Sequence, residues 1–545
     1  MNDWWKEAVI YQIYPRSFLD TSGNGIGDLG GISKKLQYVA DLGVDAIWLS
    51  PIFSSPMKDM GYDVSDYKSI DPLFGTMEDF DFLISTAHDK NLKVIIDQVL
   101  SHSSDQLEAF QESKNNKSSI KSDWFVWADP NADGSPPNNW LSVFGGSAWE
   151  WEPKRGQYYF HNFLPSQPDF NFHNEEVQDF LLDVVKFWLE KGVDGFRLDT
   201  VNYYFHDKQL RNNPQSPIEF KQPPVNPYYM QNQIFSINQD ENLVFLNKFR
   251  LLLDSFSEKT SVGEVGDSHR AIEIMKNYTS ESRLHMAYSF ELLGNKFSSS
   301  HIKKTLEEFH DSENNGNWPC WSFSNHDVTR HLSRWDQNES EEFAKLTGAL
   351  LLSLRGTPCL YQGEELGQVE TDLEFEELTD PPGIRFWPLN KGRDGCRTPM
   401  TWDHKLNNAG FTEGQPWLPV KNKQQDRSVT IQENNDESVL NLYKKLIEFR
   451  KENEPLVKGN QVFIHDEKNI LVFLREYKSS QALCVFNLND KKHIINTTSE
   501  IKPLQDLSFN AELNKNQIEL NKFGFMIIIT SDLKEQQLVN DIKLY

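Results

Sequence analysis

Four acidic residues stand where short apolar segments of the chain end, and acids in such places can carry out acid–base or nucleophilic chemistry: Asp97, Asp199, Glu264 and Asp327. Arg197 precedes Asp199 by two residues, and because side chains alternate along a strand, the two lie on the same side of it. A nearby guanidinium lowers the pKa of a carboxyl group, so we expect Asp199 to stay ionised and to act as a nucleophile or a ligand. A structural ion pair inside a barrel is the competing interpretation.

The segments that must position these acids are short, mostly apolar and separated by helical patterns. There are eight of them, at 8–18, 46–51, 93–99, 195–201, 260–265, 286–292, 321–327 and 357–365. Continuously apolar runs are typical of parallel strands that are covered on both faces. Eight strands alternating with helices predict an α/β fold, a closed (β/α)₈ TIM barrel, in which chemistry takes place at the carboxyl ends of the strands.

The spacing of the segments also predicts the domain organisation. The third and fourth strands are much farther apart than one helix and two loops require, which indicates an inserted subdomain at 102–172, rich in Asn, Ser, Pro, Gly and Trp. The barrel then comprises 1–101 and 173–456, and apolar positions at helical spacing predict that it resumes with a helix over 174–190. Alternating strands separated by turn residues predict a C-terminal antiparallel β-domain at 457–545.

Composition narrows the possible partners. The 545 residues carry a net charge of −25, which disfavours nucleic acid and anionic membrane surfaces. No segment is long and apolar enough to span a membrane, and residues 1–7 lack the basic region of a signal peptide. The four cysteines show no C-x-x-C spacing, so we expect reduced thiols in a cytoplasmic protein. Aromatic residues make up 12% of the chain, enough to fill the core and also to stack on sugar rings.

Four strings in order along the chain carry a family resemblance. They are 97–102 (DQVLSH), 195–199 (GFRLD), 263–265 (GEV) and 323–327 (FSNHD), and as a set they resemble the conserved regions of the α-amylase family, glycoside hydrolase family 13. The resemblance implies a retaining glycosidase in which Asp199 is the nucleophile, Glu264 the acid/base with a raised pKa, and Asp327 a third acid that stabilises the transition state.

The resemblance also implies a substrate pocket. Asp59 and Tyr62, in the string DMGYD, resemble the residues that close the pocket of exo-acting members, where Tyr62 stacks under the terminal glucose. In the loop 393–400, Arg397 is expected to pair with Asp59 or to reach the substrate. The remaining substrate-binding candidates are the family's two pocket histidines, the arginine beside the nucleophile and two aromatic residues of the insertion: His102, His326, Arg197, Phe144 and Phe163. The two phenylalanines could equally belong to the subdomain core.

Two further features point to a branch of the family. The string 167–171 (QPDFN) resembles the Q-P-D-L-N sequence of the oligo-1,6-glucosidase and α-glucosidase branch. Thr200 resembles the threonine of members that act on α-1,4 bonds, so we expect an exo-acting α-1,4-glucosidase of short, maltose-type oligosaccharides, able also to transfer glucosyl groups. An oligo-1,6-glucosidase, a sucrose hydrolase or isomerase and a trehalose-cleaving enzyme are the alternatives within the family, and an inert binding module is the alternative outside enzymes. The oligomeric state is expected to be a monomer or a dimer.

A loop near the N-terminus has oxygen-bearing residues at alternate positions. It resembles the family's small metal loop, and the implied ligands are Asp20, Ser22, Asn24, the Ile26 carbonyl and Asp28. An oxygen-only set of this kind suits Ca²⁺, with Mg²⁺ as the alternative, in a structural role. A turn without a metal is the competing interpretation, and no organic cofactor is implied.

Overall fold

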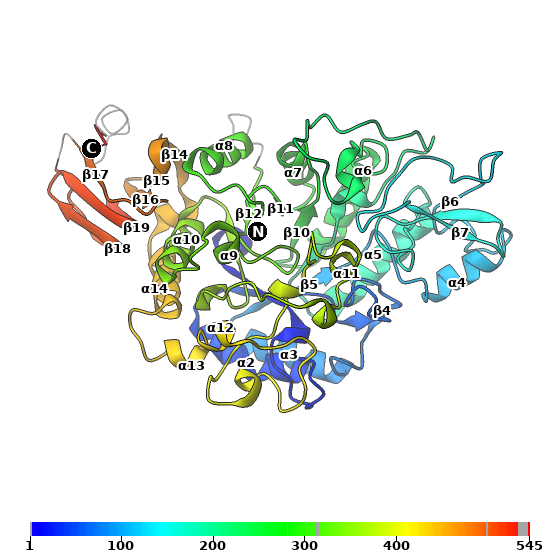
Figure 1. Cartoon of the computed structure of the whole chain (residues 1–545), viewed down its shortest axis with the longest axis horizontal. Coiled ribbons are helices and arrows are strands. Elements are labelled where there is room, and N and C mark those ends of the chain that lie inside the picture. The colour runs from blue at the N-terminus through cyan, green and yellow to red at the C-terminus, as the bar shows by residue number, and fades with distance from the viewer. Residues whose placement is uncertain (1–2, 281, 311–315, 498–499, 532–542, 545) are drawn as a thin grey trace.

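The computed structural model describes residues 3–280, 282–310, 316–497, 500–531 and 543–544. Two parts of the sequence predictions fall outside these ranges. They are residues 1–2, at the start of the N-terminal segment that does not resemble a signal peptide, and residues 532–542 of the expected C-terminal domain. A barrel occupies the middle of the molecule (Figure 1). The segment inserted after the third barrel strand lies at one end of the long axis, and the C-terminal sheet lies at the other.

The barrel is built from eight parallel strands. Seven of them lie within the segments predicted from the sequence, and the strand that ends at Trp321 begins at Cys320, one residue before its predicted segment 321–327. The eight strands are β1 (Ile10–Ile13), β2 (Ala46–Leu49), β5 (Lys93–Gln98), β9 (Gly195–Leu198), β10 (Thr260–Val265), β11 (Met286–Ser289), β12 (Cys320–Trp321) and β13 (Thr357–Tyr361). Their order is β11-β10-β9-β5-β2-β1-β13-β12, and a parallel bridge between Ala287 and Pro319 brings the two ends of this sheet together. The predicted TIM-barrel fold is therefore confirmed.

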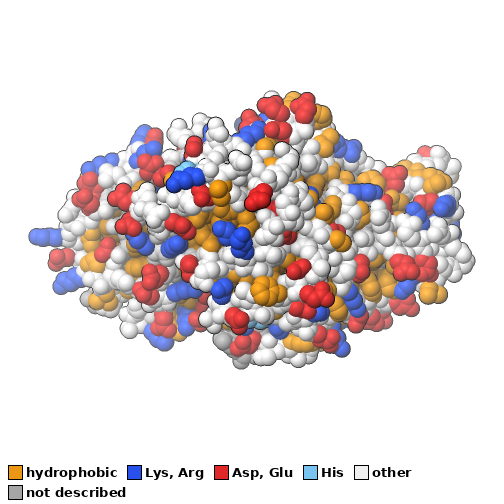
Figure 2. Space-filling view, turned by 90° about the horizontal axis from the view of Figure 1, so that it is seen from below, with side chains coloured by type: hydrophobic (Ala, Val, Ile, Leu, Met, Phe, Trp, Pro, Cys, Tyr) orange, Lys and Arg blue, Asp and Glu red, His pale blue; other side chains and the backbone are white. Residues whose placement is uncertain are grey.

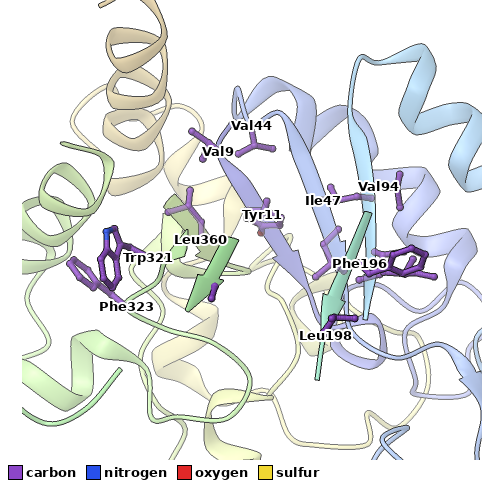
Figure 3. Packing of buried hydrophobic residues seen from close by; sticks show 14 of the residues in the cluster. Val9, Tyr11, Val44, Ile47, Val94, Phe196, Leu198, Trp321, Phe323 and Leu360 are labelled. Carbon is purple, nitrogen blue, oxygen red and sulfur yellow. The ribbon is translucent and has the colours of Figure 1, made fainter. Parts of the chain in front are cut away.

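Successive side chains of each barrel strand point to opposite faces, so the buried residues of the strands form two layers. Tyr11 and Ile47 belong to the large cluster between the strands and the surrounding helices, part of which Figure 3 shows. Their strand neighbours Ile10 and Trp48 belong to a second cluster, together with Cys320 and other residues. Burial of both faces explains why the strand segments read as continuous apolar runs.

The helices follow the strands around the barrel and in the connections. The structure has α1 (Trp4–Glu7), α2 (Leu29–Asp41), α3 (Met77–Asp89), α4 (Glu108–Asn115), α5 (Glu175–Glu190), α6 (Glu241–Asp254), α7 (Ala271–Thr279), α8 (Ser299–Phe309), α9 (His331–Trp335), α10 (Glu341–Ser353), α11 (Pro381–Phe386), α12 (Asn422–Gln425), α13 (Val429–Gln432), α14 (Val439–Glu452) and α15 (Glu454–Lys458). The helix predicted over 174–190 is α5, which begins after Asn174, whose side chain accepts a hydrogen bond from the Glu176 amide.

The segment inserted after the third barrel strand holds a small antiparallel sheet. Its strands are β6 (Trp127–Ala128), β7 (Trp149–Glu152) and β8 (Gln157–Phe160). The long loop 202–240, between β9 and α6, packs against this segment, because the Trp140 indole donates to the Arg211 carbonyl at 2.8 Å and Asn139 donates to the Asn213 carbonyl at 2.9 Å. The insertion and the loop therefore form one wall beside the barrel. A separate short hairpin, β3 (Phe53–Ser54) and β4 (Asp66–Ile70), precedes the third barrel strand.

The C-terminal sheet is antiparallel, as predicted. Its strands are β14 (Asn460–His465), β15 (Ile470–Tyr477), β16 (Ser480–Asn487), β17 (His493–Asn496), β18 (Gln505–Asn514), β19 (Gln517–Thr530) and β20 (Lys543–Leu544). The buried Arg475 ties it to the barrel by donating to the Ser353 carbonyl at 2.7 Å. Among the described residues, the helices are all too short or too polar to cross a membrane. Acidic and basic side chains are interspersed on the face that Figure 2 shows.

Candidate active site

A cavity of about 600 Å³ opens at the carboxyl ends of the barrel strands. Its lining includes nine residues predicted from the sequence: Asp59, Tyr62, His102, Phe144, Phe163, Asp199, Thr200, Glu264 and Asp327. Arg197, His326 and Arg397 are almost fully buried and contact this lining from behind. The loop 202–240 adds Tyr203, Tyr228 and other residues to the wall.

Arg197 is the centre of the acidic group. Its Nη1 lies 2.8 Å from Oδ1 of Asp199 and 2.7 Å from Oδ1 of Asp97, and its Nη2 lies 2.6 Å from Oε2 of Glu264. The Tyr288 hydroxyl accepts from the same guanidinium and donates to Oε1 of Glu264 at 3.0 Å. One guanidinium thus holds the candidate nucleophile and the candidate acid/base side by side, which explains why the chain places an arginine two residues before Asp199.

The pKa of Asp199 differs from the value expected from the sequence, whereas that of Glu264 agrees with it in direction. Burial raises the pKa of Asp199 to about 7, although Arg197 acts in the opposite direction. Arg197 acts on Asp199 in the expected direction, but the expected net result, an Asp199 with a lowered pKa, is wrong, because burial and then the carboxylates of Asp97 and Asp327 outweigh the one positive charge of Arg197. Burial likewise raises the pKa of Glu264 to about 7, in the direction expected for an acid/base.

Asp327 has the opposite environment. Burial opposes ionisation, but the neighbouring His326 and the guanidiniums of Arg393 and Arg397 lower the pKa of Asp327 far below its usual range. Its Oδ1 lies 3.2 Å from Arg393 and 3.0 Å from Arg397. Asp327 is therefore a permanent anion at neutral pH, whereas Asp199 and Glu264 titrate near neutrality.

Thr200 connects the two central acids. Its hydroxyl donates to Oδ2 of Asp199 at 3.2 Å, and its backbone amide donates to Oε2 of Glu264 at 3.0 Å. The amide can reach Glu264 from a backbone with φ of 39°, a left-handed conformation that is unfavourable for a β-branched residue. Backbone strain at this position supports a functional constraint on the turn after β9.

Polar contacts hold Asp59 and Tyr62, the residues expected to close the pocket, in the cavity lining. The Tyr62 hydroxyl donates to Asp97 at 3.0 Å, and its ring stacks on the His326 ring with centroids 5.4 Å apart. Asp59 is almost fully buried, and its Oδ2 accepts from the Gln167 side chain at 3.0 Å. This contact gives Gln167, the first residue of the string QPDFN, the physical task of holding Asp59.

The arginine that pairs with Asp59 is Arg393, with 2.7 Å between Nη2 and Oδ1. The expected pair between Arg397 and Asp59 is not formed, and Arg397 instead donates to the His326 carbonyl at 2.7 Å and to Asp327. The buried Asp380 also binds Arg393, at 2.7 Å, and so directs it across the pocket. Sequence reasoning pointed to the loop but missed Arg393, because two arginines four residues apart in an irregular loop carry no periodicity that tells which one faces Asp59.

The remaining candidates form the aromatic and histidine wall. The rings of Phe163 and His102 have centroids 5.0 Å apart, and Phe144 meets Phe163 at 5.4 Å. The Arg393 guanidinium lies 4.9 Å from the centre of the Phe144 ring. Both phenylalanines line the cavity, and they also pack in a small cluster with Tyr203. They are therefore pocket wall and local core at once.

The candidate metal loop is held by protein hydrogen bonds. Asp20 accepts from the amides of Ser22, Gly23 and Gly25 and from the hydroxyls of Ser22 and Thr412. Asn24 accepts from the Ile26 amide, and Asp28 accepts from Thr21 and from the Gly31 amide. Within the described residues, three or more His, Cys, Asp or Glu side chains nowhere form a group that could hold a metal. The oxygen-rich loop is present, and in this arrangement protein donors contact both carboxylate oxygens of Asp20.

Residues 12–459 match the family model of the α-amylase catalytic domain. The chain is 51% identical over 535 residues to a probable alpha-glucosidase of Rhizobium meliloti (strain 1021), with 96% of each protein covered. The chain belongs to the α-amylase family. Membership confirms the predicted family, and the relatives make this α-amylase family member a glycoside hydrolase.

Other relatives of this family member carry several names. It is 37% identical to the oligo-1,6-glucosidase of Heyndrickxia coagulans, with 90% of this chain and 93% of that protein covered. The crystal structure of the alpha-glucosyl transfer enzyme XgtA has 47% identity and a TM-score of 0.92, with 97% of this chain and 100% of that chain covered. The trehalulose synthase MutB has 30% identity and a TM-score of 0.88 over 97% of this chain and 100% of its own.

Proposed function

We propose that the protein is an exo-acting, retaining α-glucosidase that releases glucose from the non-reducing end of short α-1,4-linked oligosaccharides. The observation that carries the proposal is the pair of carboxyl groups, Asp199 and Glu264, bound to one guanidinium in a cavity that Asp59 and Tyr62 also line. Bridging by one guanidinium and by Thr200 suits the separation of about 5 Å that retaining glycosidases use. We infer that Asp59 and Tyr62 close the far end of this cavity, which then accommodates one terminal sugar and excludes internal attack on a long chain.

In the proposed mechanism, an oxygen of Asp199 attacks the anomeric carbon while Glu264 gives its proton to the departing glycosidic oxygen. The covalent glucosyl–Asp199 ester is then cleaved by water, whose proton returns to Glu264. An acceptor hydroxyl in place of water gives glucosyl transfer. Near pH 7 the coupled pair holds about one proton, and the productive form places it on Glu264. The permanent anion Asp327 favours the positive charge that develops on the sugar ring.

The preference of the enzyme for one glycosidic linkage over another tests the role of Thr200. We expect kcat/KM to be higher for maltose than for isomaltose, sucrose or trehalose. Thr200→Val removes the hydroxyl that donates to Asp199 and keeps the side-chain shape, so it should lower the maltose-to-isomaltose ratio of kcat/KM about tenfold. The measurement is steady-state kinetics on the four disaccharides.

Thr86→Val is the matched control, since the Thr86 hydroxyl bonds only to the Phe82 carbonyl on α3, away from the cavity. This variant should leave the ratio unchanged, and Thr200→Ser, which keeps the hydroxyl, should restore most of it. If the wild-type enzyme prefers isomaltose, the protein is an oligo-1,6-glucosidase and the α-1,4 proposal is wrong. A preference for sucrose would indicate a sucrose hydrolase or isomerase, and a preference for trehalose would indicate a trehalose-cleaving enzyme.

We also propose a structural Ca²⁺, or Mg²⁺, in the loop 20–28. The support is the chemistry of the donors, which are carboxylate, hydroxyl, amide and carbonyl oxygens at alternate positions. If the ion binds, a chelator should lower Tm by about 2 °C or more in a thermal scan, and added Ca²⁺ should restore it. Asp20→Asn should abolish this chelator effect. An identical Tm with and without chelator would contradict the proposal and leave the loop as a turn held by Asp20.

We further propose that the enzyme works in the cytoplasm as a monomer or a dimer. The support for a reducing compartment is that Cys320, Cys359, Cys396 and Cys484 are all buried free thiols. The high negative charge supports the absence of nucleic-acid and membrane partners. Cell fractionation and sedimentation of the purified protein test the two statements separately.

A further inference from the structure

Arg393 is held by carboxylates on three sides. Its Nη2 lies 2.7 Å from Oδ1 of Asp59, and its Nη1 lies 3.2 Å from Oδ1 of Asp327. Asp380 binds the remaining edge of the guanidinium, with 2.7 Å between its Oδ1 and Nη2. The described lining of the sugar cavity includes Arg393, Asp59 and Asp327 but not Asp380. Asp380 therefore contacts this arginine from behind the cavity wall.

The contact of Asp380 uses both the backbone and the side chain of Arg393. The Arg393 backbone amide donates to Oδ2 at 2.7 Å, and Nε and Nη2 donate to Oδ1 at 3.1 and 2.7 Å. Burial opposes ionisation of Asp380, but the guanidiniums of Arg393 and Arg397 lower its pKa. An anion that binds the backbone amide and the guanidinium of one residue fixes the direction in which that side chain extends.

The local sequence explains why Asp380 is available for this contact. Asp380 is the N-cap residue of α11, a position at which an aspartate usually accepts from the amide two or three residues later. Pro381 and Pro382 occupy the first two helical positions and have no amide hydrogen. Within the described chain the Asp380 side chain makes no cap hydrogen bond, and its carboxylate binds Arg393 instead.

A second aspartate fixes the position of Asp380 itself. The buried Asp394 accepts from the amides of Thr379 and Asp380 at 2.6 and 2.8 Å, and from the Thr379 hydroxyl at 3.0 Å. The Arg393 amide donates back to Asp380. The two ends of the segment 381–392 therefore bind each other in both directions, which holds the Asp380 carboxylate in place beside the guanidinium.

We propose that Asp380 is a positioning residue for recognition of the terminal sugar, and that it acts by directing Arg393 towards Asp59. The inference rests on the proposed function, because it takes Arg393 and Asp59 to bind the terminal glucose. Loss of the Asp380 carboxylate should weaken this binding in the substrate complex and in the transition state alike, which raises KM. Arg397 keeps its own contact with Asp327 at 3.0 Å, so the chemical step should change little.

Asp380→Asn tests the proposal, because the amide keeps the shape of the side chain but turns a donor towards the donors of Arg393. We expect KM for p-nitrophenyl α-glucoside and the inhibition constant of glucose each to rise about tenfold, with kcat changed less than threefold. A purely structural role would lower Tm without this split between KM and kcat. An unchanged KM and inhibition constant would overturn the proposal. Asp380→Glu restores the carboxylate and should recover most of the lost affinity.

A double-mutant cycle tests whether Asp380 acts through Arg393. Arg393→Gln alone should raise KM, and the double variant Asp380→Asn/Arg393→Gln should have the KM of Arg393→Gln within about twofold. Effects of the two substitutions that multiply would show that Asp380 acts independently of Arg393 and would overturn the proposal.

Asp207→Asn is the matched control. Asp207 accepts from the same three donors of an arginine, namely the amide, Nε and Nη2 of Arg211 at 3.0, 2.9 and 2.8 Å, and neither residue belongs to the described cavity lining. This variant should keep the wild-type KM and inhibition constant. Failure of the wild type to cleave the aryl glucoside would contradict the proposed function. Glucose affinity measured by calorimetry would still test Asp380, and equal affinities of wild type and Asp380→Asn would overturn its role.

Discussion

Asp199→Asn should lower kcat/KM on an aryl α-glucoside by at least about 10⁴-fold while leaving the fold intact. The amide fits the same space beside Arg197 and Thr200 but cannot form the glucosyl ester, so both chemical steps are lost. The measurement is initial rate with p-nitrophenyl α-glucoside, and Tm confirms folding. Wild-type turnover in this variant would mean that Asp199 is only the partner of a barrel ion pair.

The matched control lies at the other end of the same strand. Asp194 precedes Gly195, is buried, and binds His88 at 2.7 Å and the Val94 amide at 2.9 Å, far from the cavity lining. Asp194→Asn should lower Tm and change kcat/KM by less than about threefold, because it weakens structural contacts only. Comparison of the two variants separates a chemical role from a structural one on a single strand.

Glu264→Gln should lower kcat/KM on maltose about 10³-fold and change the pH profile. The wild-type profile is expected to be bell-shaped around pH 7: activity falls at lower pH as Asp199 gains a proton and at higher pH as Glu264 loses its own. Glutamine cannot titrate, so the fall at high pH should disappear. The measurement is kcat/KM on maltose from pH 4 to about 10.

Two further observations sharpen this test. An aryl glucoside with a good leaving group needs little protonation, so Glu264→Gln should impair its first step far less than that of maltose, and added azide should speed release of the enzyme-bound glucose. Glu273→Gln, an exposed position on α7, is the control and should keep the bell-shaped profile. A variant of Glu264 that retained the fall at high pH would move the acid role to another residue.

The barrel was predictable because its strands are buried on both faces and each ends at polar residues. Segments such as 93–99 and 260–265 therefore matched β5 and β10 within a residue. The cavity was predictable in outline for the same reason, since acids at strand ends meet at one edge of the barrel. The roles assigned to those acids remain predictions.

The features that the sequence could not show depend on contacts between residues that are far apart in the chain. The net pKa shift of Asp199 follows first from its burial and then from the carboxylates of Asp97 and Asp327 beside it. The pairing of Asp59 with Arg393 follows from the course of an irregular loop. The left-handed backbone of Thr200 was equally hidden, because a β-branched residue argues against that conformation. Periodicity describes elements, and each of these features lies between elements or just past their ends.

The arginines that keep Asp327 ionised come from residues 393 and 397, after the last barrel strand, whereas Asp199, Glu264 and Asp327 all lie earlier in the chain. Because the ribosome synthesises a chain from its N-terminus to its C-terminus, a nascent chain contains every acid of the site before it contains these two arginines. An unfinished or truncated chain that ends before residue 393 therefore has the three acids but lacks the two guanidiniums that lower the pKa of Asp327.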